Sequence, residues 1–269
     1  MVTTLVLPRV AARSFRRAAA VTGRNVAAAR HFGYWWVLFS GFFEPVLYLL
    51  SIGVGVGALV KSFTLADGRT VSYAAFVAPA MLAASAMNGA LAESTMNLFG
   101  KMKYMRLYDA VLATPVKPFE VALGELMWGL VRGSIYSVAF LALMVGMGLT
   151  SVGWAVAAFP ATVVVGLAFG GLGMAITTVM RGWQDFDYIT VVQFALFLFS
   201  GTFAPADAYH PVMKVLVAAT PLYHGVQLIR GLTTGVLGWG LLGHVAYLAA
   251  LAAIGLTIAS RRMGKLLCK

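Results

Sequence analysis

The sequence predicts an all-α integral membrane protein with six transmembrane helices. Hydrophobic residues make up 61% of its 269 residues, and charged residues only 11%, which is about half the charged fraction of a soluble domain. The mean hydropathy is +0.86. Apolar runs of about 20 residues recur, and each is long enough to cross a bilayer core of about 30 Å. The runs lack the apolar-polar alternation typical of a membrane β-barrel.

Six apolar runs predict the spans, with ends uncertain by a few residues. They lie at residues 37–60, 71–99, 121–149, 152–180, 188–203 and 239–260. An even number of spans puts both termini on the same side of the membrane.

The basic residues predict which side that is. Most of the 20 Lys and Arg residues precede the first span, follow the sixth, or lie in the loops after the second and fourth. Because such residues concentrate on the cytoplasmic side, we expect a multi-pass plasma-membrane protein with both termini in the cytoplasm. Topology therefore explains the net charge of +11 better than a nucleic-acid partner does. The single cysteine, Cys268, excludes an intramolecular disulfide, and no Cys or His spacing indicates a metal site.

The segment 1–33 predicts a cytoplasmic amphipathic helix, and residues 34–269 form the six-span domain. At the helical period, the arginines between Arg9 and Arg30 fall within an arc of about 140°. Such a helix would lie on the inner leaflet and bind membrane lipids. The alternative is a basic flank that only sets the topology.

The loop at 101–120, "KMKYMRLYDAVLATPVKPFE", predicts a short helix with one apolar face, ended by Pro115 and Pro118. Such a helix would lie across the cytoplasmic mouth, either as a docking element for a soluble partner or as a simple connector. If the loop docks a partner, the contacting residues would be Tyr104, Met105, Arg106, Leu107, Tyr108, Asp109, Leu112 and Pro115.

The segment 204–236 predicts two short helices, 209–219 and a second one capped by Thr220 with Pro221 at its first position. Neither is long enough to span the bilayer. They are expected to be re-entrant or interfacial helices that close the extracellular mouth, and the alternative is a surface loop. The candidate gate residues are Pro205, Met213, Pro221, Leu222, Tyr223 and His224.

Several polar residues lie within the apolar runs, where they cost free energy. Glu44 and Arg132 are candidates either to line a translocation path or to pair helices. Glu93, Asp185 and Asp187 lie near the cytoplasmic surface, and structural pairing is the favoured interpretation for them. The aromatic run before the first span suits a membrane-boundary belt or an entry surface for a lipid-linked sugar. The complete set of path candidates is Tyr34, Trp35, Trp36, Glu44, Pro45 and Arg132.

Three separated stretches resemble one family. "GFFEPVLYLLSIGVGVG", "RLYDAVLATPVKPFEVALGELMWGLVRG" and "FLFSGTFAPADAYHPVMKVLVAATPLYHGVQLIRGLTTG" are similar to the permease subunits of ABC type-2 transporters, especially the nodulation lipo-oligosaccharide, polysaccharide and drug exporters. The resemblance implies a dimer of permeases, formed with a second copy or a sister permease, and two cytoplasmic ATP-binding subunits. It implies ATP-driven export of an amphipathic or lipid-linked substrate, and it assigns residues 104–118 as the coupling helix.

The chain itself has no phosphate-binding loop of the form G-x-x-x-x-G-K-[ST], and its nearest fragment is "FGKM". ATP and Mg²⁺ are therefore expected on the partner subunit, and no cofactor, metal or catalytic group is expected here. The alternative function is a self-contained secondary transporter or a membrane-embedded transferase. These would show two similar halves or convergent polar groups, and neither feature is evident.

Overall fold

The computed structural model describes residues 6–31, 43, 46–57, 62–64, 68, 70–205 and 210–267. This part of the chain is almost entirely helical, as predicted. Its only sheet pairs two three-residue strands in an antiparallel hairpin. The elements are α1 (Val6–His31), η1 (Leu49–Val56), β1 (Ser62–Thr64), β2 (Thr70–Ser72), α4 (Tyr73–Ala92), η2 (Glu93–Asn97), η3 (Gly100–Tyr104), α5 (Leu107–Leu112), α6 (Pro118–Gly146), α7 (Val152–Thr177), α8 (Asp185–Leu198), α9 (Pro211–Ala219), α10 (Pro221–Thr234) and α11 (Gly240–Leu267).

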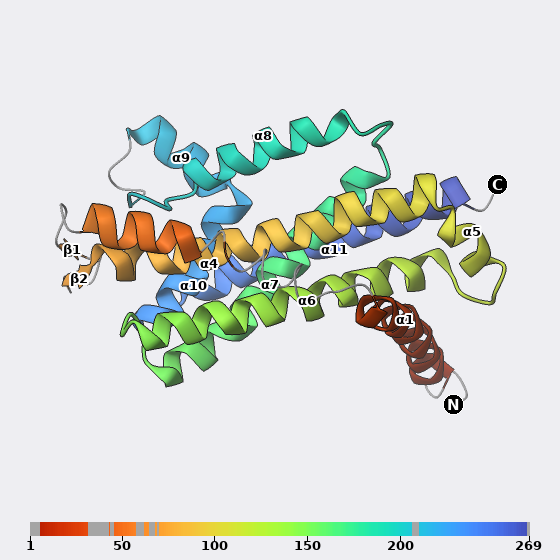
Figure 1. Cartoon of the computed structure of the whole chain (residues 1–269), viewed down its shortest axis with the longest axis horizontal. Coiled ribbons are helices and arrows are strands. Elements are labelled where there is room, and N and C mark those ends of the chain that lie inside the picture. Colours follow the sequence, from red (N-terminus) through yellow and green to blue (C-terminus); the bar gives the residue numbers. More distant parts are fainter. Residues whose placement is uncertain are drawn as a thin grey trace.

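Four long helices form the body of the molecule. Figure 1 shows α4, α6, α7 and α11 running side by side, with α5 and the C-terminus at one end of the bundle. Within the described residues, these four are the helices long and apolar enough to cross a membrane, with η2 and η3 continuing α4 to Tyr104. They coincide with the second, third, fourth and sixth predicted runs.

The count of six spans is not confirmed. Much of the first predicted run, including 37–42 and 58–60, lies outside the described residues. The fifth run forms α8, which has 14 residues and is shorter than the ~20 residues that a perpendicular span needs. Helix α8 ends at Leu198 because Phe199 leaves the helical conformation and Gly201 adopts a left-handed one, with φ of 69°.

Local signals explain where the helices begin. Ser72, Ser151 and Thr220 each accept a hydrogen bond from the backbone N–H three residues later, at the starts of α4, α7 and α10. The predicted cap at Thr220 is thus confirmed. Helix α10 also starts with a proline, as predicted, and it is bent from α9 by 84°.

Close backbone contact joins α7 to α11. A Cβ atom added at Gly255 would lie 2.4 Å from the carbonyl carbon of Gly171, and one added at Gly171 would lie 2.8 Å from the oxygen of Ala252. Small residues on both helices permit this approach, which is how helices pack in a membrane. Helix α7 also contacts α4, α6 and α10.

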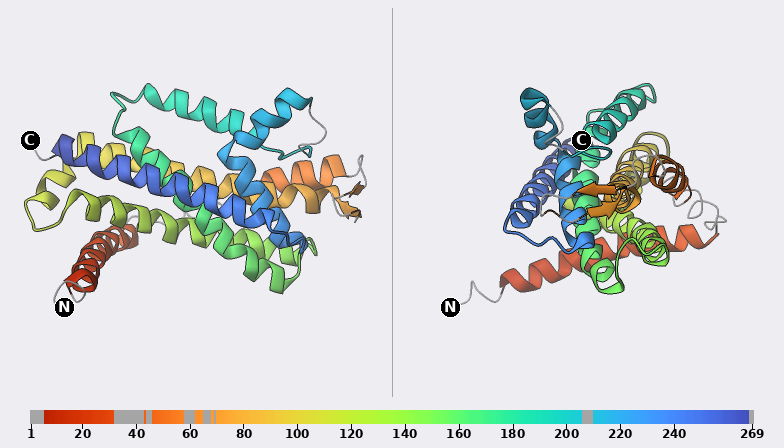
Figure 2. Two further views of the ribbon diagram at one scale, coloured as in Figure 1. Left: turned by 180° about the vertical axis from the view of Figure 1, so that it is seen from behind. Right: turned by 90° about the vertical axis from the view of Figure 1, so that its left-hand side faces the viewer.

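Helix α1 runs crosswise to the bundle. The end-on view in Figure 2 shows α1 lying across the axes of the long helices. It contacts α6 near the end of the bundle that carries α5 (Figure 1). A helix in this position has one face on the bundle and another available to its surroundings.

Candidate functional site

The coupling segment is divided at Arg106. This residue adopts a left-handed backbone conformation, with φ of 46°, which is uncommon for a residue with a side chain. Tyr104 therefore ends the helix continuous with α4, whereas α5 starts separately at Leu107. The sequence predicted one short helix across this break. Its local apolar spacing did not reveal that the first part extends the second span.

The short helix α5 has an exposed side and a buried side. Asp109 on α5 is exposed, as are the flanking residues Met105, Arg106 and Pro115, and Met105 keeps 73% of its surface accessible. Leu107 and Leu112 are half-buried. A soluble partner approaching this end of the bundle would meet the exposed set first.

Tyr108 anchors α5 to the bundle. Its side chain is 1% exposed and packs in a cluster that also contains Met102, Val121 and Met263. Burial, together with the negative charge of Glu125, raises the pKa of the Tyr108 phenol well above its usual range. The phenol therefore stays neutral at physiological pH. Sequence reasoning treated Tyr108 as a partner contact, but the structure directs it inward.

Tyr104 belongs to an aromatic cluster that reaches α8. Its ring stacks on Trp183, with centroids 5.4 Å apart, and Phe99 and Phe186 meet Trp183 at 5.4 and 5.3 Å. These contacts connect the end of η3 to the start of α8. Nearby, the carboxylate of Asp185 accepts a hydrogen bond from the backbone N–H of Arg181, in the loop before α8, at 2.6 Å.

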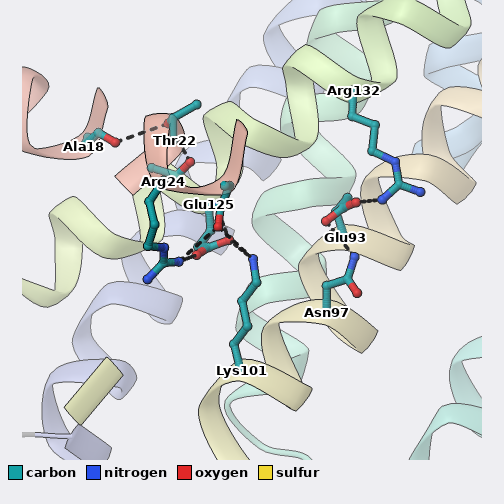
Figure 3. A network of polar contacts seen from close by, with 10 residues as sticks. Ala18, Thr22, Arg24, Glu93, Asn97, Lys101, Glu125 and Arg132 are labelled. Atoms are coloured by element: carbon teal, nitrogen blue, oxygen red, sulfur yellow. Dashed lines mark hydrogen bonds and ion pairs between the residues drawn. The ribbon is translucent and has the colours of Figure 1, made fainter. Parts of the chain in front are cut away.

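Glu125 is the centre of a charged junction between three elements. Its carboxylate accepts hydrogen bonds from Lys101 on η3 at 2.6 Å, and from Arg24 and Asn25 on α1 at 2.9 Å each. Figure 3 shows Glu125 between Arg24 and Lys101. Glu125 itself is 8% exposed. A buried carboxylate needs such partners, so this single side chain holds α1 and η3 to α6.

The same face of α1 packs tightly against α6. Thr22 donates its hydroxyl hydrogen bond to the carbonyl oxygens of Gly124, at 2.9 Å, and Ala18, at 3.2 Å. A Cβ atom at Gly124 would lie 2.6 Å from both the Ala18 oxygen and the Val21 Cβ. Ala18 and Val21 are buried where α1 packs against α6.

The arginines of α1 whose side chains the structure describes divide into two groups. Arg24 bonds Glu125, and Arg17 lies 3.6 Å from the carboxylate of Glu120. Arg13 and Arg16 are exposed. Helical periodicity found the basic arc but did not distinguish its protein-bound members from its exposed ones.

A second ion pair crosses the bundle between Glu93 and Arg132 (Figure 3). Asn97 donates to the other oxygen of Glu93 at 2.8 Å, and the Arg132 Nε donates to the hydroxyl of Tyr136 at 2.9 Å. Pairing between helices, one of the two interpretations left open for Arg132, is thus observed. The other ionisable path candidate, Glu44, lies outside the described residues together with Tyr34, Trp35, Trp36 and Pro45.

A cavity of about 190 Å³ opens elsewhere, between the helical turn before η1, α4 and α8. Its polar wall includes Asn88 and Gln193, and the Gln193 amide donates to the Asn88 oxygen at 3.2 Å. The residues that line it are Tyr48, Met81, Ala84, Ser85, Asn88, Thr190, Gln193, Phe194 and Phe197. The sequence analysis did not identify these residues, because it considered mainly charged residues within the apolar runs. The uncharged amides and hydroxyls in those runs could have indicated the cavity.

The predicted gate residues gather where α9 meets α10. Met213 lies on α9, whereas Pro221, Leu222, Tyr223 and His224 form the first turn of α10. Leu222 is buried in the main core, and Pro205 ends the turn after α8.

Arg230, which was not predicted, secures this region. Its guanidinium donates to the carbonyl oxygens of Gly201, at 2.9 Å, and Phe76, at 3.3 Å, and it lies 4.0 Å from the centre of the Phe76 ring. One side chain thereby ties α10 to α4 and to the turn after α8.

Substituting Gly124 by valine should detach α1 from α6. The added side chain would overlap the Ala18 carbonyl and Val21, whereas Gly133→Val, on the same helix with nothing within 4 Å of its Cβ position, serves as the control. Limited proteolysis in detergent should cut between α1 and the bundle faster in the Gly124 variant only. Equal cleavage rates would contradict this packing of α1.

Comparison with known proteins shows which family the chain matches. Residues 19–233 match the family model described as ABC-2 type transporter. Nodulation protein J of Rhizobium leguminosarum bv. trifolii is 32% identical over 195 residues, covering 71% of this chain and 72% of the relative. Nodulation protein J of Sinorhizobium fredii is 30% identical over 212 residues, covering 78% and 79%.

Proposed function

Since the chain belongs to the ABC-2 type transporter family, we propose that it is the permease subunit of an exporter driven by ATP hydrolysis on a separate cytoplasmic subunit. The observation that carries this proposal is the exposed side of α5, held on the bundle by the buried Tyr108. A short helix with one side anchored and the other free suits the transmission of force from a docked protein. The ATP-binding subunit would therefore contact Met105, Arg106 and Asp109.

The charged junction around Glu125 would transmit a movement of the docked ATP-binding subunit from α5 into the bundle. Helix α5 packs through Tyr108 beside Glu125, and Glu125 bonds both α1 and η3. A displacement of α5 would thus act on the second span, the third span and α1 together. The aromatic stack of Tyr104 on Trp183 offers a parallel route to α8.

Docking at α5 would also fix the orientation in the membrane, because the end of the bundle that carries α5 would then face the cytoplasm. In the proposed topology, both termini and α5 face the cytoplasm, and α1 lies on the inner leaflet with Arg13 and Arg16 toward lipid headgroups. Each such residue contributes about 1 kcal/mol near an anionic surface. Residues 37–60 would supply the first span and α8 the fifth, with α9 and α10 as re-entrant helices at the extracellular mouth.

The substrate path would pass the cavity between the first span, α4 and α8. A dimer partner, either a second copy or a sister permease, would complete this path on the open side of α8, where Tyr188, Val191 and Phe194 are exposed. The cavity mixes aromatic rings with uncharged polar groups, which suits an amphipathic or lipid-linked molecule such as a glycolipid, a lipo-oligosaccharide, a polysaccharide precursor or a drug. The similarity to Nodulation protein J supports an export role.

A charge-reversal pair tests the docking of α5. We expect Arg106→Glu with Asp109→Arg to abolish substrate-stimulated ATP hydrolysis by the co-purified ATP-binding subunit, because both side chains are exposed on the proposed contact surface. The control exchanges Arg181→Glu and Asp187→Arg, an exposed pair of the same charges just before α8 and in its first turn. Both permeases should be recovered equally well in membranes. Full stimulation in the α5 variant would exclude this docking surface, and failure of the wild type to co-purify with any ATPase would exclude the proposed function itself.

A further inference from the structure

Two histidines from different helices face each other through the same ring atom. His224 lies in the first turn of α10, and His244 follows the start of α11 at Gly240. Their Nδ1 atoms are 2.7 Å apart, and the two ring centroids are 4.9 Å apart. Neither ring is fully buried.

The surrounding aromatic residues hold both imidazoles in this orientation. The ring of Tyr247 stacks on His224 with centroids 3.9 Å apart and an interplanar angle of 20°. The Tyr247 hydroxyl in turn donates to the carbonyl oxygen of Ala219 at 3.0 Å. Tyr223 meets His224 and His244 nearly edge-on, at interplanar angles of 79° and 82°. The two Nδ1 atoms are thus directed at one another by contacts from α10, α11 and the end of α9.

We propose that His224 and His244 form a binding site for a divalent transition-metal ion, with Zn²⁺ as the ion best suited to it. Neutral imidazole is a common zinc ligand. Two Zn–N bonds of about 2.05 Å at a tetrahedral angle place the nitrogens about 3.3 Å apart, so the rings need to separate by only about 0.6 Å. The proton that one Nδ1 donates to the other would move to the Nε2 of its own ring, so that both neutral imidazoles offer an Nδ1 lone pair to the metal.

The rest of the coordination shell would consist of water. The described residues contain no cluster of three or more His, Cys, Asp or Glu side chains, so the site has two protein ligands and an open outer side. Such a site is weaker than a closed structural zinc site. The bound ion would join α10 directly to α11, restraining the two elements relative to one another.

Zinc titration of the untagged, full-length protein in detergent tests this site. We expect isothermal titration calorimetry to show one Zn²⁺ bound per chain, with a rise in melting temperature that is absent when Mg²⁺ replaces Zn²⁺. Mutating a residue that only hydrogen-bonds to a metal ligand lowers metal affinity about 10–100-fold. His224→Gln and His244→Gln each remove a ligand itself, so we expect each to lower zinc affinity at least about 100-fold. The control is His210→Gln, which removes an exposed histidine outside the pair.

A second variant separates metal binding from folding. His244→Cys retains a zinc-binding donor at the same position and should recover most of the affinity that His244→Gln loses. Unchanged zinc affinity in both glutamine variants would overturn the site. So would an absence of zinc binding by the wild type, which would leave the pair as a hydrogen bond between two imidazoles. The measurements need no transport assay, so they stand apart from the proposed export function.

Discussion

Gly255→Ala should strongly destabilise the helical bundle although it adds only one carbon atom. That atom would lie 2.4 Å from the carbonyl carbon and 2.6 Å from the carbonyl oxygen of Gly171. Backbone atoms cannot rotate away as a side chain can, so α7 and α11 would have to separate along their contact. We expect a loss of about 3 kcal/mol or more, the upper end of the cost of overpacking a core, measured as a lower melting temperature and a lower yield of monodisperse protein.

Gly243→Ala provides the matched control for that experiment. Gly243 is on the same helix, and its added Cβ would meet nothing within 4 Å. Because alanine favours helix more than glycine does, this variant should be as stable as the wild type or slightly more stable. If both alanine variants melted at the same temperature, the close contact of α7 with α11 would be wrong.

Glu125→Gln should loosen the junction of α1, η3 and α6. The change leaves Lys101 and Arg24 without the carboxylate that now accepts their hydrogen bonds at 2.6 and 2.9 Å. Hydrogen bonds to charged groups contribute about 1.5–3 kcal/mol each, but side chains that are 19% and 33% exposed can regain water. We therefore expect a net loss of about 2 kcal/mol in the free energy of unfolding.

A double-mutant cycle isolates the pair at the centre of this junction. Lys101→Met removes the shortest partner of Glu125 while keeping a long apolar side chain. If the contact is real, the stability loss of Glu125→Gln with Lys101→Met should be smaller than the sum of the two single losses, by about 0.5–3 kcal/mol. Asp109→Asn, at an exposed carboxylate on α5, is the control and should be neutral. Strict additivity would show that Glu125 and Lys101 do not interact.

The family and the main helices could be predicted because short stretches of sequence are enough to indicate them. Long apolar runs predicted α4, α6, α7 and α11, since a span must satisfy its backbone groups internally and present apolar side chains over its whole length. The Thr220 cap and the following proline predicted the start of α10 for an equally local reason. Three stretches sufficed for the resemblance to ABC type-2 permeases, and the family match confirms it.

The limits of local pattern are visible at α8 and at Arg106. The apolar run at 188–203 predicts a helix along its whole length, but α8 ends at Leu198 and the chain turns at Gly201, whose carbonyl oxygen bonds Arg230. The loop at 101–120 reads as one short helix, but the left-handed Arg106 separates α5 from the extended second span. In both cases the chain's path depends on residues far away in sequence.

By itself, the sequence determined the class, the helical character of α1, the four long spans, and the absence of a nucleotide-binding loop from the chain, because composition and helical period are properties of single segments. Only the tertiary structure determined which side chains far apart in the sequence contact each other. Glu125 meets Arg24 from 101 positions away, Arg230 meets Phe76 from 154 positions away, and His224 meets His244 across the turn that follows α10. The position of a charged residue or a histidine in the sequence does not identify its partner, because the packing of the helices determines which side chains meet.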